Sequence, residues 1–162
     1  MRLSGYVVKE EAKAYIDALF TCEKLGIRET PITFCIDTGA SGTCLSESEA
    51  IRFGIDLGTL KRAKPAHGVG GSVNSYFLED VKIGFPINGH KAVVSFPMIL
   101  IFAQNKSPIR RAVEIVKIVL SKLEGRPKGE EKALPNLLGF DFLKDCKISF
   151  SETEAYLDIE AS

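Results

Sequence analysis

The residues with the clearest chemical potential are Asp37, Thr38 and Gly39, which follow a short apolar run that ends at Ile36. An aspartate is unfavourable in a strand, and burying its charge is costly unless another group stabilises it. Gly39 permits a tight turn that a side chain would obstruct. The pattern predicts an acid presented at the tip of a strand. A loop with an Asx-type cap is the simpler interpretation of the same residues.

The composition indicates an ordinary globular domain. The 162 residues are 45% hydrophobic and 26% charged, and this length buries enough surface for one domain without a disulfide or a metal. The 21 basic and 21 acidic residues cancel, so we expect neither nucleic acid nor a membrane surface as a partner. A small β domain that binds nucleic acid therefore has little support.

The cysteines and histidines do not form a metal-binding pattern. No two of the four cysteines are spaced as C-x-x-C, and there are only two histidines. We therefore expect no metal and no cofactor. The chain shows no signal peptide and no apolar run of transmembrane length, so we expect a cytoplasmic protein with reduced thiols. The cysteines are Cys22, Cys35, Cys44 and Cys146.

The elements that must position Asp37 are mostly strands. Residues 3–8 read as a short strand, and residues 12–21 alternate with period two, with Ala12, Ala14, Ile16, Ala18 and Phe20 on one face. A further strand leads from Thr30-Pro31 to Asp37, and residues 43–45 form another. Ser46 and Glu49 have the spacing of a capping box, which predicts a short helix that Gly54 ends.

Residues 61–84 are expected to form a long hairpin whose tip contains Gly68, Gly70 and Gly71. Glycines allow backbone angles that other residues avoid, so this tip could act as a flap over a site. A loose hairpin is the structural alternative. A phosphate-binding loop is disfavoured because no Lys-Ser/Thr pair follows and no helix begins there.

In the second half of the chain, the sequence pattern changes from strand-like to helical and then back to mainly strand-like. Residues 91–102 are apolar and strand-like, with Pro97 indicating an edge or a bend. From Ser107-Pro108 to Gly125, apolar residues recur at helical spacing, which predicts one amphipathic helix. This helix is expected to pack on the sheet; a partner contact and a membrane surface are the alternatives. Residues 137–138 then suit a buried strand, 140–145 a short helix, and 147–159 a terminal hairpin.

Three segments, in this order, resemble the retropepsin-like aspartic proteases, the single-domain relatives of pepsin. They are residues 36–41, the glycine tip at 68–71, and residues 137–143, which read LLGFDFL. The resemblance covers about residues 3–103 and 134–160. It implies a mainly β fold, a retropepsin-like acid protease barrel with a short helix after the catalytic loop. The whole chain, 1–162, would be one such domain, with a helical insertion at about 104–133.

The resemblance implies an aspartic endopeptidase that cleaves a peptide or protein substrate. This class holds a water between two carboxyls, one acting as base and the other as acid. The sequence contains a single Asp-Thr/Ser-Gly triplet, so the second acid is expected to be Asp37 of another copy in a two-fold homodimer. The family pattern gives Thr38 a contact across the dimer and Gly39 a backbone N–H near the carboxylate. Val69, Gly70 and Gly71 would close over the substrate.

The substrate pockets and the dimer contacts are less closely defined by the resemblance. Ile36 and the neighbourhood of Leu137 and Leu138 would form apolar pockets beside the cleaved bond. Phe140 and Asp141 replace the basic-polar pair of the retroviral enzymes, which leaves the dimer contacts undefined. A catalytically silent peptide-binding or scaffold module with the same fold is the alternative function.

Overall fold

The computed structural model describes residues 1–68, 71–103 and 134–159. Strands dominate, as predicted, and the helical elements are short. The elements are β1 (Arg2–Val8), η1 (Lys9–Glu11), β2 (Lys13–Cys22), η2 (Glu23–Leu25), β3 (Ile27–Ile36), β4 (Cys44–Ser46), α1 (Glu47–Arg52), η3 (Leu57–Thr59), β5 (Ala66–Gly68), β6 (Gly71–Ile87), β7 (His90–Ala103), β8 (Leu137–Leu138), α3 (Phe140–Leu143), β9 (Cys146–Phe150) and β10 (Glu154–Ile159).

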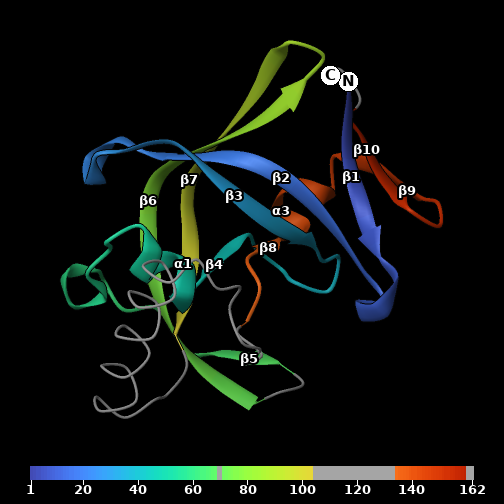
Figure 1. The fold of residues 1–162 in the computed structure, drawn as a ribbon. Coiled ribbons are helices and arrows are strands. Elements are labelled where there is room, and N and C mark those ends of the chain that lie inside the picture. Colours follow the sequence, from blue (N-terminus) through green and yellow to red (C-terminus); the bar gives the residue numbers. More distant parts are fainter. Residues whose placement is uncertain (69–70, 104–133, 160–162) are drawn as a thin grey trace, which may run out of the picture.

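Within the described residues, the strands follow one another in the order β5-β6-β7-β4-β8-β3-β2-β1-β10-β9. The long strand β6 also pairs with β2, so the sheet curls back on itself around a hydrophobic core (Figure 1). Phe20, Phe34 and Leu138 are fully buried in this core. Burial of such apolar side chains is the main force that stabilises the fold.

The alternation predicted for residues 12–21 is confirmed over β2. Ala14, Ile16, Ala18 and Phe20 are buried, and the intervening side chains lie on the other face. Ala12 does not continue this row. It lies before the strand with a φ of 51°, and its side chain is exposed.

The helix predicted after the Asp37 turn is α1, and half of its capping box forms. The Ser46 hydroxyl accepts a hydrogen bond from the backbone N–H of Glu49 at 3.2 Å. The reciprocal bond is absent because the N–H of Ser46 donates to the Asn136 side chain, and the Glu49 carboxylate pairs with Arg52. Gly54 follows the helix with a φ of 71°, as a helix-ending glycine should.

Two hairpins extend the sheet at opposite ends (Figure 1). β6 and β7 turn at Asn88 and Gly89, which have φ values of 39° and 81°. β5 and β6 form the predicted glycine-tipped hairpin, in which Gly68 pairs with Gly71. Pro97 in β7 lies opposite Asp80, which has a φ of 55°.

The first strand, β1, and the last described strand, β10, lie side by side (Figure 1). β1 pairs with β2 on one side and with β10 on the other, and β9 forms the predicted terminal hairpin with β10. Arg2 and Asp158 form a two-pronged ion pair, with nitrogen–oxygen distances of 2.7 and 2.8 Å. The amphipathic helix predicted between Ser107 and Gly125 lies outside the described residues.

Candidate active site

Asp37 continues the line of β3 beyond its last residue. The backbone N–H groups of Cys35 and Asp37 both donate to the segment that includes β8, at 2.8 Å to Asn136 and 3.1 Å to Leu138. Because both N–H groups point toward the same neighbour, the side chains of Cys35 and Asp37 share one face of the sheet. Ile36 lies between them and packs against the core on the opposite face.

The turn after Asp37 fixes its carboxylate. The N–H of Gly39 donates to Asp37 Oδ1 at 2.9 Å, and the N–H of Ala40 donates to the Asp37 carbonyl at 3.2 Å. A Cβ on residue 39 would lie 3.1 Å from Oδ1, which is tighter than most such contacts, so glycine suits this position. Among the described residues, every hydrogen bond of Asp37 is with a backbone group. The carboxylate is therefore oriented and half-exposed.

Thr38 lies at the exposed end of this turn. Its hydroxyl makes no hydrogen bond to another of the residues that the structure describes. Of the three expected flap residues, Gly71 is the first residue of β6, and Val69 and Gly70 lie outside the described residues.

The segment after β8 clamps the Asp37 loop from behind. Asp141 Oδ1 accepts hydrogen bonds from the backbone N–H of Thr43 at 2.9 Å and from its hydroxyl at 2.8 Å. The N–H of Phe140 donates to the Ala40 carbonyl at 2.8 Å. Gly139 lies so close to the loop that an added Cβ would approach the backbone of Gly42 to 2.3 Å. These contacts set the loop's position.

Asn136 joins three segments through one buried amide. Its oxygen accepts from the N–H of Ser46 at 2.9 Å, and its nitrogen donates to the Thr33 carbonyl at 3.0 Å. Neither Asn136 nor Thr43 belongs to a motif that is recognisable in the sequence, and Asp141 is notable there only as part of the segment 137–143. The one local indication of a role for Asn136 was a polar residue next to the apolar Leu137-Leu138 run. Its partners could not be predicted because they lie about a hundred residues away in the sequence.

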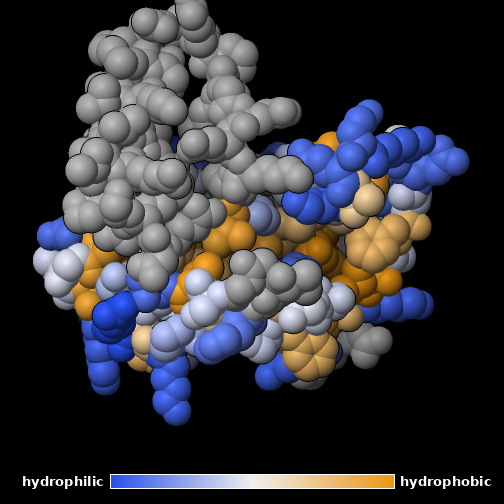
Figure 2. Space-filling model, turned by 90° about the horizontal axis from the view of Figure 1, so that it is seen from below, coloured by the Kyte–Doolittle hydropathy of each residue, from blue (hydrophilic) through white to orange (hydrophobic). Residues whose placement is uncertain are grey.

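The face that carries Asp37 differs in part from the expected apolar pockets. Leu138 is fully buried in the core, so the expectation that it lines a pocket is wrong, whereas Ile36 is half-buried and packs against the core. Leu137, which pairs with both Cys35 and Cys44, is half-buried on the Asp37 face. Figure 2 views the molecule from below Figure 1, from the side of β5, and hydrophobic side chains gather in the middle and on the right of the view.

The thiols near the site are poor nucleophiles. Burial raises the pKa of Cys44 to about 12, and the charges of Asp37 and Asp141 act in the same direction. Burial also raises the pKa of Cys35. Both thiols therefore stay protonated at neutral pH, and a protonated thiol is a weak nucleophile. The chemistry available on this face is that of a carboxylate.

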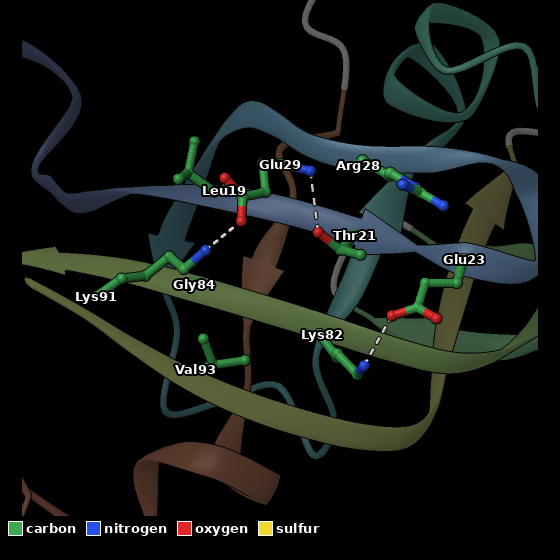
Figure 3. Close-up of a pocket in the computed structure, with 9 residues that line it drawn as sticks. All are labelled: Leu19, Thr21, Glu23, Arg28, Glu29, Lys82, Gly84, Lys91 and Val93. Carbon is green, nitrogen blue, oxygen red and sulfur yellow. Dashed lines mark hydrogen bonds and ion pairs between the residues drawn. The ribbon is translucent and has the colours of Figure 1, made fainter.

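A separate hollow of about 530 Å³ lies toward the other end of β2 (Figure 3). Two ion pairs neutralise most of the charged side chains that line it: Lys82 with Glu23 at 2.8 Å, and Lys91 with Glu29. Because these charges cancel in pairs, the hollow offers no reactive group comparable to Asp37. Among the described residues, no cluster of His, Cys, Asp and Glu could hold a metal ion.

The comparisons agree with this geometry. The family model described as "gag-polyprotein putative aspartyl protease" matches residues 24–99, which include Asp37 and the hairpin of β5 and β6. A crystal structure of a retropepsin-like aspartic protease from Rickettsia conorii matches 97% of this chain and 89% of its own, at 17% identity and a TM-score of 0.55. The chain has a retropepsin-like fold.

The retropepsin-like fold predicted from the three segments is thus confirmed. EIAV protease complexed with the inhibitor HBY-793 is also similar, at 17% identity over 86% of this chain and 92% of that one, with a TM-score of 0.45. A search of curated proteins by sequence found no match. No helix in the described part of this retropepsin-like chain is long and apolar enough to cross a membrane.

Proposed function

We propose that this retropepsin-like chain is an aspartic endopeptidase that hydrolyses peptide bonds as a homodimer. The observation that carries the proposal is the setting of Asp37. Its carboxylate is held by the N–H of Gly39 at 2.9 Å and lies half-exposed on the open face of the sheet. An anchored, accessible carboxylate of this kind is suited to acid–base chemistry on a water molecule.

The proposed mechanism uses one Asp37 from each subunit. The ionised carboxylate takes a proton from a water held between the two groups, and the water oxygen attacks the peptide carbonyl. The protonated carboxyl hydrogen-bonds the carbonyl oxygen and stabilises the tetrahedral intermediate. Two carboxyls at this distance share one proton because both cannot ionise together, so they titrate as a pair. No cofactor is needed for these steps.

The neighbouring residues have matching roles in this proposal. The exposed Thr38 hydroxyl is available to bond the partner's loop and hold the two acids in register. Val69, Gly70 and Gly71 would close over an extended peptide. The silent peptide-binding module remains the alternative, and the anchoring of Asp37 speaks against it. We also propose a cytoplasmic location, which is supported by the four free cysteines.

Replacement of Asp37 by Asn tests the chemistry. We expect Asp37→Asn to remove cleavage of a peptide library between about pH 3 and about pH 7 while leaving the dimer intact by sedimentation. Asp145→Asn is the matched control, because Asp145 is exposed and lies outside the site. Pepstatin should inhibit the wild-type protein. Full cleavage by Asp37→Asn, or none by the wild type at any pH, would overturn the proposal.

A mixing experiment tests the shared site. After the two proteins exchange subunits at equal amounts, about a quarter of the dimers retain both aspartates. Activity should then fall to about a quarter of that of undiluted wild type at the same total concentration. A fall to only half would mean that each subunit works alone.

A further inference from the structure

The face that carries Asp37 continues across the neighbouring strands as a row of side chains. Tyr15 in β2 lies directly opposite Cys35 in β3, and Tyr6 in β1 lies directly opposite Tyr15. Directly opposite residues on paired strands present their side chains on the same face. Tyr6 and Tyr15 therefore share the face of Cys35 and Asp37, and they are outside the core cluster.

The separation places Tyr15 within reach of a bound substrate. Two residues along a strand span about 6.6 Å, and neighbouring strands lie about 4.8 Å apart, so the backbones of Tyr15 and Asp37 are about 8 Å apart. An extended peptide advances about 3.3 Å per residue. A substrate side chain within about three positions of the cleaved bond can therefore contact the Tyr15 ring.

The Tyr15 ring is held in place before any ligand arrives. Its centroid lies 5.9 Å from that of Tyr6, with 30° between the ring planes. Its hydroxyl donates a hydrogen bond to the Glu11 carboxylate. Burial, followed by this hydrogen bond, raises the pKa of Tyr15, so the hydroxyl remains a donor. A ring fixed in this way loses little conformational entropy on binding.

The charges around the two rings are mostly negative. Asp17 lies two residues from Tyr15 on the same face and accepts from the Thr33 hydroxyl at 2.6 Å. Glu154 in β10 lies opposite Tyr6. Lys13, two residues from Tyr15 on the same face of β2, is the cation in this group, and it lies 4.0 Å from the Glu11 carboxylate. Burial and then the charge of Asp17 raise the pKa of Tyr6, consistent with this setting.

Other charged groups packed nearby do not reverse this balance. Arg2 in β1 pairs with Asp158 and lies over the Tyr156 ring, 4.9 Å from its centroid. Arg52, which lines a hollow together with Asp17, pairs with Glu49. The two tyrosines thus combine aromatic faces with an excess of carboxylates, which is the chemistry that attracts an ammonium or guanidinium group.

We propose that Tyr15, held by Tyr6 and Glu11, is a specificity-determining residue that selects a lysine or arginine side chain in the substrate. This rests on the proposed function, because the substrate is taken to be an extended peptide at Asp37. The substrate class is a peptide with a basic side chain within about three residues of the cleaved bond. Tyr15 acts through contact with the substrate and takes no part in the proton transfers.

The test compares peptides that carry arginine or citrulline, its uncharged counterpart, at each of the nearby positions. Cleavage is measured with Asp37 intact, and binding is measured by fluorescence anisotropy in an Asp37→Asn background. At one position we expect arginine to be preferred about fivefold. The double variant Glu11→Gln with Asp17→Asn should abolish this preference while keeping the shapes of both side chains. Tyr15→Leu should weaken it.

Glu10→Gln is the control, because Glu10 is an exposed acid in the same short helix as Glu11. It should keep the full preference. Equal affinity for arginine and citrulline in the parent, or an unchanged preference in the double variant, would overturn the inference. Dissociation of the double variant into monomers would also overturn it by assigning the tyrosines to a subunit contact. Absence of cleavage alone counts against the proposed function, since the binding measurement still decides the role of Tyr15.

Discussion

Asp141 Oδ1 accepts two hydrogen bonds from the buried Thr43, which lies 98 residues earlier in the sequence: one from its hydroxyl at 2.8 Å and one from its backbone N–H at 2.9 Å. The same hydroxyl accepts from the N–H of Gly139 at 3.2 Å. This contact ties the loop that carries Asp37 to the segment that follows β8. The position of Asp37 therefore depends on a residue pair that lies behind its loop.

Loss of the Thr43 hydroxyl should lower the stability of the folded protein. Thr43→Val removes a donor to Asp141 and leaves the buried N–H of Gly139 without its acceptor, so we expect a loss of about 2–3 kcal/mol in the free energy of unfolding. Urea denaturation measures it. Thr153→Val, at an exposed turn, should be nearly neutral. Equal stability of the two variants would show that the Asp141 contact is unimportant.

Gly139 should tolerate no side chain. An added methyl would lie 2.3 Å from the Gly42 carbonyl carbon and 2.4 Å from its oxygen, so backbone must move. We expect Gly139→Ala to lose more than about 3 kcal/mol of stability or to fail to fold. The control is Gly42→Ala, where the nearest atom is an Asp141 oxygen at 3.9 Å. A thermal melt of Gly139→Ala that matches the control would contradict the close packing.

Cys44 should resist thiol reagents in the folded protein. Its side chain is fully buried and its pKa is raised to about 12, so both access and thiolate content are low. Iodoacetamide at about pH 8, followed by mass spectrometry, should label Cys44 only after denaturant is added. Rapid labelling without denaturant would mean that the site opens readily. The proposed proteolytic activity should survive Cys44→Ala, and its loss would contradict the view that the thiol takes no part in the reaction.

Acid should weaken the pairing of the chain ends. The hydrogen bond and charge of Arg2 lower the pKa of Asp158 in the folded state. A carboxyl whose pKa is lower in the folded state stabilises the folded protein at pH values above its unfolded-state pKa. This stabilisation is lost as the pH falls through the folded-state pKa. The melting temperature should therefore decrease when the pH is lowered below about 4, and Arg2→Ala should remove part of this pH dependence. Lys144→Ala, at an exposed position, should leave the pH profile unchanged.

Local patterns in the sequence were sufficient to predict several secondary-structure elements. The period-two alternation predicted β2, and the apolar run before Asp37 predicted β3. The turn at Asn88-Gly89 was not predicted, although both residues tolerate positive φ and so provide a local signal for it. Where a local signal competed with a distant partner, the partner prevailed: the N–H of Ser46 binds Asn136 in place of Glu49.

The sequence by itself determined that an acid stands at the end of a strand in a tight turn, and that its chain supplies one such motif. Those properties depend on neighbouring residues and on the backbone freedom of glycine. The tertiary structure decided which side chains accompany Asp37 on its face, Tyr15, Cys35 and Leu137 rather than Ile36 and Leu138. It also decided that Asp141 holds the loop. Both depend on strand register and on contacts between distant segments, because a shift of one residue would exchange the two faces of the sheet.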